Sequence, residues 1–503
     1  MAPDSDQQLK DRPPPNAEQS PEASEPPEDS LGSPESPSLF ADLNLGQTGQ
    51  SLANMEAVED LEDPPREEVS SPVLSLVNRI LAEAIISGAS DIHVEPQQTA
   101  MHVRFRQDGV LRTVDTLPKN LVPAVTSRFK IMADLDIAER RLPQDGRIRR
   151  KFQQEVVDFR VSTLPGRFGE KVVLRLLDNS ATQLGLDTLI TDLKARRDVR
   201  DMGGKPFGML LVTGPTGSGK STTLYSLLAE RNDPGINICT VEDPIEYGLA
   251  GITQTQVNRE KGYDFASALR AFMRQDPDVL LVGETRDLET ARTAIKAALT
   301  GHLVLTTLHC NDAVSAFARL DEMGVEPFLV SSSLLGVVSQ RLVRRLCVDC
   351  RIPHHPGHEE LAHFGLEASD EESITFFRTP KLNAGTANRC PSCMGRGYSG
   401  RVGVYEVLTM TENLSAAVAQ RASTHELRRL ALEAGMKTLL GYGLDLVRQG
   451  LTSLEEVERM LLTDTGLELE RRARALNSLS CRGCGAGLHD EWLECPYCLK
   501  VRR

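Results

Sequence analysis

The chain has 503 residues, 40% of them hydrophobic and 25% charged, which is typical of a soluble protein with roughly two to four domains. Residues 1–70 hold 17 acidic and 3 basic residues and so account for the whole formal charge of −14, and the neutral remainder argues against nucleic acid as the main ligand. No apolar stretch approaches the ~18 residues of a membrane span and no secretory signal is visible, so we expect a cytosolic protein.

Residues 1–70 are predicted to form a disordered acidic tail. They contain 11 of the 28 prolines and no periodic apolar pattern before about Leu39. Two interpretations stay open for this tail. It is either a solvated linker or a partner-binding segment centred on Leu39–Met55.

A mixed α+β domain is predicted over residues 71–185. Apolar residues recur at helical spacing in Val73–Ile86, and Met101–Gly109 alternates and ends in Asp-Gly, as a hairpin strand does. Arginines recur in this domain, and each alone would be an ordinary surface charge. They are Arg147, Arg160 and Arg175.

The phosphate-binding loop is the strongest motif of the sequence. Met209–Thr213 reads as a buried parallel strand, Gly214–Ser221 matches GxxxxGK[ST], and a helix is predicted to about Glu230. Glycines allow backbone N–H groups to surround phosphates, a lysine reaches the β- and γ-phosphates, and a serine hydroxyl binds Mg²⁺. The predicted nucleotide-binding residues are Gly214, Pro215, Thr216, Gly217, Ser218, Gly219, Lys220, Ser221 and Thr222.

Acidic residues and histidines follow three further predicted strands. Glu242–Glu246 comes after one apolar strand, and Val279–Val282 leads into Gly283-Glu284, with glycine where a Walker B strand usually has aspartate. A fourth strand has His302 and His309 at its two ends, and a structural or a catalytic role is equally open for them. Carboxylates at the carboxyl ends of parallel strands can orient water or bind Mg²⁺.

Taken together, these segments resemble the secretion and type IV pilus ATPase family. Glu242–Glu246 resembles its Asp box, Arg270–Asp278 leading into Gly283–Asp287 resembles its Walker B region, and Thr300–Ala313 resembles its His box. The match spans roughly residues 71–465, in family order.

The resemblance implies an α/β fold with a RecA-like P-loop ATPase core over 186–345, a PAS-like domain before it and a helical C-terminal subdomain over 401–465. It also implies ATP and Mg²⁺ as cofactors, a homohexameric ring, and an inner-membrane platform protein as partner of this cytoplasmic, peripheral motor. The arginines would approach the γ-phosphate, and the sequence leaves open which act across a subunit boundary. The catalytic residues implied are Glu242, Glu246, Glu284, His309, Arg147, Arg160, Arg270 and Arg274.

Eight of the ten cysteines form four C-x2-C pairs. Two such pairs can complete a tetrahedral Zn²⁺ site, and we assign the first site to a subdomain over 346–400. This set, Cys347, Cys350, Cys390 and Cys393, resembles the tetracysteine insertion of the assembly and secretion branch. Retraction ATPases lack that insertion, which favours pilus extension.

The second cysteine set predicts a compact zinc ribbon over 479–503, after a linker over 466–478. Its ligands would be Cys481, Cys484, Cys495 and Cys498, and Trp492 lies inside its loop. The ribbon is not a standard part of the family. It serves either protein contact or a purely structural purpose.

Two other functional classes stay open. One is a nucleotide-binding scaffold without catalysis, and the other is a DNA-translocating motor on the same core. Within the favoured class, pilus assembly and type II secretion are both possible. Many assembly ATPases carry an extra N-terminal docking domain that we do not find in 1–70, so the mode of docking is open.

Overall fold

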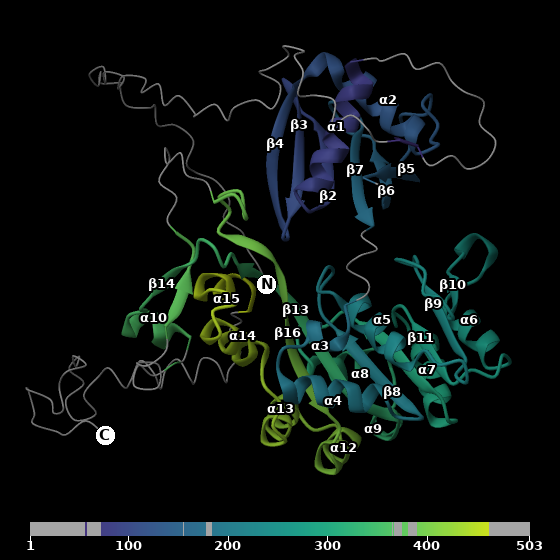
Figure 1. Ribbon diagram of the computed structural model, residues 1–503. Coiled ribbons are helices and arrows are strands. Elements are labelled where there is room, and N and C mark those ends of the chain that lie inside the picture. Colours follow the sequence, from purple (N-terminus) through teal and green to yellow (C-terminus); the bar gives the residue numbers. More distant parts are fainter. Residues whose placement is uncertain are drawn as a thin grey trace, which may run out of the picture. The chain divides into compact units, whose positions relative to one another are not determined.

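The computed structural model describes residues 56–57, 72–153, 155–177, 184–364, 366, 375–380 and 390–461 (Figure 1). They build two seven-stranded sheets and one two-stranded sheet. We call 72–177 the N-terminal region and 184–461 the core region. No described helix is both long and apolar enough to cross a bilayer.

The N-terminal region contributes six strands, in the order β5-β6-β7-β2-β3-β4, to an antiparallel sheet whose seventh strand, β1 (Glu56–Ala57), lies at the edge next to β5. Its burial alternates along the strands, so one face is apolar and packs against the helices while the other is polar. The elements are α1 (Pro72–Ile86), β2 (Ala89–Pro96), β3 (Ala100–Gln107), β4 (Val110–Pro118), α2 (Val122–Met132), β5 (Gln144–Phe152), β6 (Glu155–Leu164) and β7 (Lys171–Leu177). The expected helix over 73–86 and the hairpin near 101–109 are confirmed.

The edge strand β1 (Glu56–Ala57) was not expected. It pairs antiparallel with β5, at Lys151 and Arg150, although 1–70 was predicted to be disordered. A two-residue strand without apolar alternation leaves no pattern that sequence reasoning can detect. The remaining residues of the predicted tail lie outside the described part of the chain.

The core region is an α/β sheet in the order β10-β9-β11-β12-β8-β13-β16, parallel except for the antiparallel edge strand β16. Its strands are β8 (Gly208–Thr213), β9 (Ile238–Glu242), β10 (Thr253–Gln256), β11 (Val279–Val282), β12 (Leu303–Leu308), β13 (Leu334–Leu346) and β16 (Tyr398–Thr409). Its helices are α3 (Leu186–Leu189), α4 (Leu193–Gly203), α5 (Lys220–Arg231), α6 (Phe265–Phe272), α7 (Leu288–Leu299), α8 (Ser315–Glu322), α9 (Pro327–Ser333), α12 (Glu412–Ala419), α13 (Thr424–Glu433), α14 (Leu439–Arg448) and α15 (Leu454–Leu461).

Helices cover both faces of this sheet, because its central strands are buried throughout. One apolar cluster joins Leu210 and Val212 to α4, α5, α14 and α15. The other joins Met209 and Leu211 to α6, α7, α8, α9, α12 and α13. The alternation along β8 therefore directs neighbouring residues into opposite layers, and the C-terminal helices belong to the same body as the sheet.

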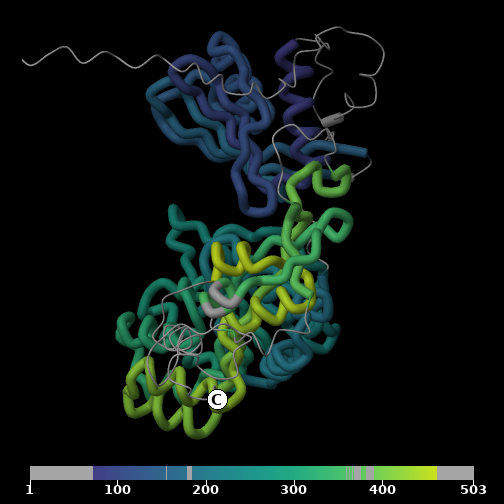
Figure 2. The backbone as a smooth tube through the Cα atoms, turned by 90° about the vertical axis from the view of Figure 1, so that its left-hand side faces the viewer, coloured from purple at the N-terminus to yellow at the C-terminus, as the bar shows by residue number. Residues whose placement is uncertain are grey.

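A long hairpin leads out of the core sheet. β13 and β16 pair from Gly336↔Thr409 to Leu346↔Tyr398, and α14 and α15, in yellow, lie beside this green hairpin in both views (Figure 2). Beyond the hairpin, β14 (Ile352–His354) and β15 (Phe376–Arg378) form the two-stranded sheet, next to α10 (His358–His363). The pairing brings Cys347 and the segment before Tyr398 to the same end of the hairpin.

Candidate functional site

The phosphate-binding loop lies between β8 and α5, as predicted. Gly214, Gly217 and Gly219 have φ of 142°, 77° and 88°, a backbone region that glycine adopts without strain. The Lys220 Nζ donates to the carbonyl oxygens of Gly214 (2.9 Å) and Pro215 (3.1 Å). Burial lowers the pKa of Lys220, and the Glu284 carboxylate opposes that shift. The loop and its lysine thus have the geometry of a phosphate cradle.

Gln340 of β13 contacts the phosphate-binding loop, and the sequence analysis did not predict this role. Its side chain is 1% exposed, and its Nε2 donates to the Ser218 carbonyl oxygen at 2.8 Å. A Cβ at Gly214 would lie 2.4 Å from the Gln340 carbonyl oxygen. The first loop position must therefore be glycine for packing as well as for φ. Gln340 lies between Ser339 and Arg341 in β13, so no sequence pattern singled it out.

Glu284 meets His309 and Arg286 at the carboxyl ends of β11 and β12. The His309 Nε2 lies 3.3 Å from Glu284 Oε1, and the Arg286 Nη2 donates to Glu284 Oε2 at 2.6 Å. Parallel pairing of the two strands brings Glu284 and His309 together although they are 25 positions apart in the chain. Arg286 was within the recognised motif but had no predicted role.

Gly283 explains the unusual Walker B ending. Its N–H donates to the Val241 carbonyl oxygen at 2.8 Å, and a Cβ there would lie 3.2 Å from Glu242 Cα. An aspartate at this position would crowd β9. Two side-chain hydrogen bonds then fix the strand ends, since Thr307 Oγ1 donates to the Gly283 carbonyl oxygen at 2.7 Å and Thr285 Oγ1 lies 2.9 Å from the hydroxyl of Thr306.

Glu242 lies in a buried hydrogen-bond network. Its carboxylate accepts from the Tyr225 hydroxyl, from Thr240 Oγ1 at 2.7 Å and from Gln254 Nε2 at 3.2 Å. Burial raises the pKa of Glu242, although these three donors oppose the shift. Glu246, by contrast, is exposed. The two acids of the Asp box therefore have different surroundings.

His302 lies at the opposite end of β12 from the site. Its Nδ1 is 3.0 Å from the Ala297 carbonyl oxygen, at the C-terminus of α7. Glu284 and His309 follow the carboxyl ends of β11 and β12, whereas His302 precedes the amino end of β12 and contacts α7 instead. A catalytic role for His309 stays a prediction.

The predicted arginines occur in two groups. Arg270 of α6 pairs with Glu289 of α7, and Arg274, two residues beyond α6, donates to the Arg270 carbonyl oxygen at 2.8 Å, so neither of these bonds reaches the phosphate loop. In the N-terminal region, Arg147 pairs across strands with Arg160, which pairs with Arg175, so all three share the polar sheet face.

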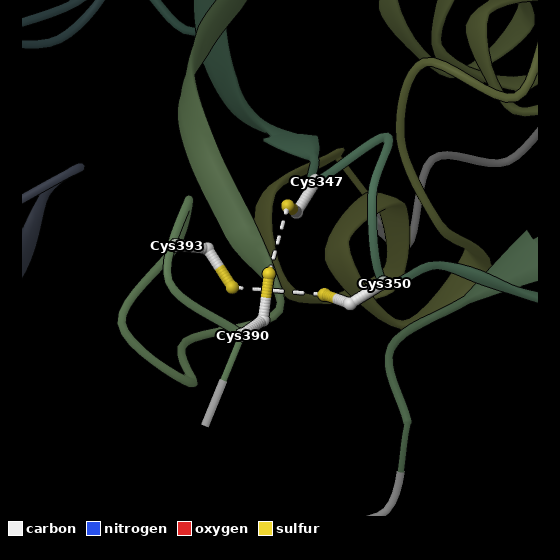
Figure 3. A group of neighbouring side chains, drawn as sticks. All are labelled: Cys347, Cys350, Cys390 and Cys393. Atoms are coloured by element: carbon white, nitrogen blue, oxygen red, sulfur yellow. Dashed lines mark hydrogen bonds between the residues drawn. The ribbon is translucent and has the colours of Figure 1, made fainter. Parts of the chain in front are cut away.

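The tetracysteine set forms a compact cluster (Figure 3). All four sulfur atoms lie within 4.8 Å of one another, with Cys347 Sγ 3.8 Å from Cys390 Sγ and Cys350 Sγ 3.6 Å from Cys393 Sγ. A tetrahedral ZnS₄ site with Zn–S near 2.3 Å requires sulfur separations of about 3.8 Å. The residues present therefore fit Zn²⁺. The ligands predicted for the second site, Cys481, Cys484, Cys495 and Cys498, lie outside the described residues.

Residues 66–459 match the family described as type II/IV secretion system protein. The chain belongs to this family. The type II secretion system ATPase E of Vibrio cholerae is 48% identical over 405 residues, which are 80% of this chain and 78% of that protein. The type IV pilus assembly ATPase PilB of Myxococcus xanthus is 47% identical over 420 residues, which are 82% of this chain and 72% of that protein.

A solved structure supports the same secretion-family assignment. The pilus retraction motor PilT with bound ADP is 28% identical, and the alignment covers 78% of this chain and 98% of PilT with a TM-score of 0.53. The mixed α/β ATPase fold expected from the sequence is thereby confirmed for the core of the chain.

Proposed function

We propose that this chain is a Mg²⁺-dependent ATP hydrolase that works as a homohexamer and powers assembly of a type IV pilus or a type II secretion pseudopilus. The observation that carries the proposal is the contact of Glu284 with His309 at the carboxyl ends of β11 and β12, in the same parallel sheet whose strand β8 leads into the phosphate loop. It is supported by relatives at 47–48% identity that are named as secretion and pilus assembly ATPases.

In this proposal the loop glycines and Lys220 bind the phosphates, and the Ser221 hydroxyl holds Mg²⁺, which would neutralise the developing charge. Glu284 accepts the proton of the attacking water, and His309 orients the Glu284 carboxylate. Glu242 and Glu246 would orient water or Mg²⁺. Because the bonds of Glu242 to Tyr225 and Gln254 must open before Glu242 can do so, we rank Glu284 first among the acids.

Arg147, Arg160, Arg270 and Arg274 would stabilise the γ-phosphate during transfer, as arginine fingers do. The shared sheet face of Arg147 and Arg160 supports a joint action of this pair. In a hexamer, some of these arginines would reach the γ-phosphate bound by a neighbouring subunit. We place the hexamer at the cytoplasmic side of the inner membrane, attached through a platform protein.

The tetracysteine cluster favours assembly over retraction. It lies between β13 and β16, and we propose that it binds one structural Zn²⁺. The same proposal includes the domain boundaries. Residues 71–185 form a PAS-like domain, and the ATPase core, the tetracysteine subdomain and the helical subdomain end at 345, 400 and 465. A second Zn²⁺ is bound by the ribbon at 479–503.

Steady-state hydrolysis tests the proposal and its two alternatives. The wild type should release phosphate from ATP only with Mg²⁺, and Lys220→Ala should abolish the release while the exposed-lysine control Lys205→Ala should not. Wild-type protein without turnover would indicate the scaffold. Strong stimulation by duplex DNA would indicate the translocase. Light scattering with an ATP analogue should show a hexamer, and a persistent monomer would contradict the ring.

A further inference from the structure

The loop that carries His309 is attached at its near end to the sheet that carries Glu284. Thr307, two residues before His309, donates through Oγ1 to the Gly283 carbonyl oxygen at 2.7 Å. The Thr285 N–H donates to the Thr307 carbonyl oxygen at 3.0 Å. These bonds fix where the loop starts, but they leave the orientation of the following residues to contacts farther along.

The far end of the loop is attached to the C-terminal helices by an ion pair. Arg428 of α13 donates through Nη2 to Asp312 Oδ2 at 2.8 Å, and the side chains are only 14% and 17% exposed. Asp312 also accepts from the N–H (2.8 Å) and Oγ (2.7 Å) of Ser315, the first residue of α8, through Oδ1. Burial alone would raise the pKa of Asp312, but the bonds from Arg428 and Ser315 lower it, so the carboxylate is charged at neutral pH.

A second buried carboxylate makes a parallel attachment. Glu406 of β16 is 1% exposed, and its Oε1 accepts from the Ala313 N–H at 2.7 Å. Its Oε2 accepts from the Leu439 N–H at 3.2 Å, at the N-terminus of α14. One carboxylate therefore ties the end of the His309 loop to the start of another C-terminal helix.

We propose that Arg428, acting through Asp312, is a positioning residue that holds His309 against Glu284, so that α13 and α14 control the geometry of the hydrolysis site. Asp312 lies only three positions after His309, about 10 Å of extended chain, so a shift of Asp312 reaches His309 directly. The inference rests on the proposed ATPase function.

Stability alone does not account for the Arg428–Asp312 pair. Buried ion pairs contribute little more to stability than apolar residues of the same volume. Asp312 binds Ser315, the first residue of α8, through its other oxygen atom, so that contact does not require Arg428. What the Arg428–Asp312 pair specifically determines is the position of the loop that carries His309.

The test is the ATPase activity of Arg428→Met, which keeps most of the side-chain length but removes the guanidinium. We expect kcat to fall on the order of 10–100-fold, the usual consequence of misplacing a catalytic group by about 1 Å, with the KM for ATP within about twofold. The matched control is Arg421→Met, whose ion pair with Asp321 is 67% and 50% exposed. It should change neither constant.

A double-mutant cycle separates positioning from general damage. If Arg428 acts through His309, Arg428→Met should cost no further kcat in a His309→Ala background. The variant Asp312→Ser with Arg428→Met removes both charges and retains a hydroxyl that can accept from the Ser315 N–H, so it folds without a buried unpaired carboxylate and should show the same loss of kcat.

The outcomes distinguish the two proposals. Wild-type protein without ATPase activity would refute the proposed function itself. With an active wild type, normal kcat in Arg428→Met, losses that add to those of His309→Ala, or full activity of His309→Ala would each overturn the positioning role.

Discussion

The buried carboxylate of Glu456 yields the sharpest stability prediction. Glu456 follows the capping residue Ser453 of α15, a pattern in which the acid often bonds back to the cap. Here the Glu456 N–H donates to the Ser453 hydroxyl at 3.4 Å, but the Glu456 carboxylate accepts from Arg344 of β13 instead of from the backbone of Ser453. Arg344 donates from its backbone N–H (3.0 Å), Nε (2.9 Å) and Nη2 (2.7 Å), while Arg459 donates from the next turn of the helix.

Arg344 and Arg459 bind the same carboxylate, but their side chains differ in solvent exposure. The Glu456 side chain is 0% exposed, Arg344 is 16% exposed and Arg459 is 44% exposed. Removing one partner of a buried pair costs about 3–5 kcal/mol, whereas an exposed pair on one helix contributes about 0.2–1 kcal/mol. Because Arg459 still compensates the charge, we expect roughly 3 kcal/mol for Arg344→Met and below about 1 kcal/mol for Arg459→Met.

Differential scanning calorimetry measures the difference. At roughly 2–4 °C per kcal/mol, Arg344→Met should lower the Tm of the core region by about 6–12 °C, and Arg459→Met by no more than about 4 °C. Elemental analysis should accompany the scan, since Arg344 is three residues from Cys347 and zinc loss would add to the effect. Equal shifts in the two variants with zinc retained would refute the argument from burial.

Four other outcomes are expected. Glu284→Gln should bind a fluorescent ATP analogue as the wild type does while hydrolysis falls about 10²–10⁴-fold, and lost binding would make Glu284 structural. Arg147→Ala and Arg160→Ala should lower kcat by on the order of 10³-fold or more with little change in nucleotide affinity, and unchanged turnover in both would leave them as surface charges. Burial raises the pKa of Glu406 to about 7 from its usual 4.5, so its stabilising contribution is complete below pH 4.5 and is lost as pH rises through 7. The difference in the free energy of unfolding between wild type and Glu406→Gln should therefore shift by roughly 1.4 kcal/mol in favour of the variant between pH 6 and 8. A difference that stays constant over this range would contradict the argument. Full-length protein should contain two Zn²⁺ and Cys347→Ser one, whereas fewer than two in the freshly purified wild type would refute the count.

Local patterns were sufficient for the elements that carry the chemistry. The strand before Gly214 is a short apolar run because both faces of a parallel sheet are buried, and the loop glycines signal the backbone that phosphates require. The C-x2-C spacing predicts sulfur atoms close enough to share an ion, and the cluster at Cys347 has that geometry. In each case the determining residues are neighbours in the sequence.

The supports of the site were decided only by the tertiary structure. Gln340 lies 122 residues after the Ser218 carbonyl oxygen that it binds, and Arg428 lies 116 residues after Asp312. Neither a glutamine within a strand nor an arginine on an amphipathic helix has a sequence pattern that identifies its partner. Strand order and helix docking select that partner, because hydrogen bonds and ion pairs depend on distances that the fold alone sets.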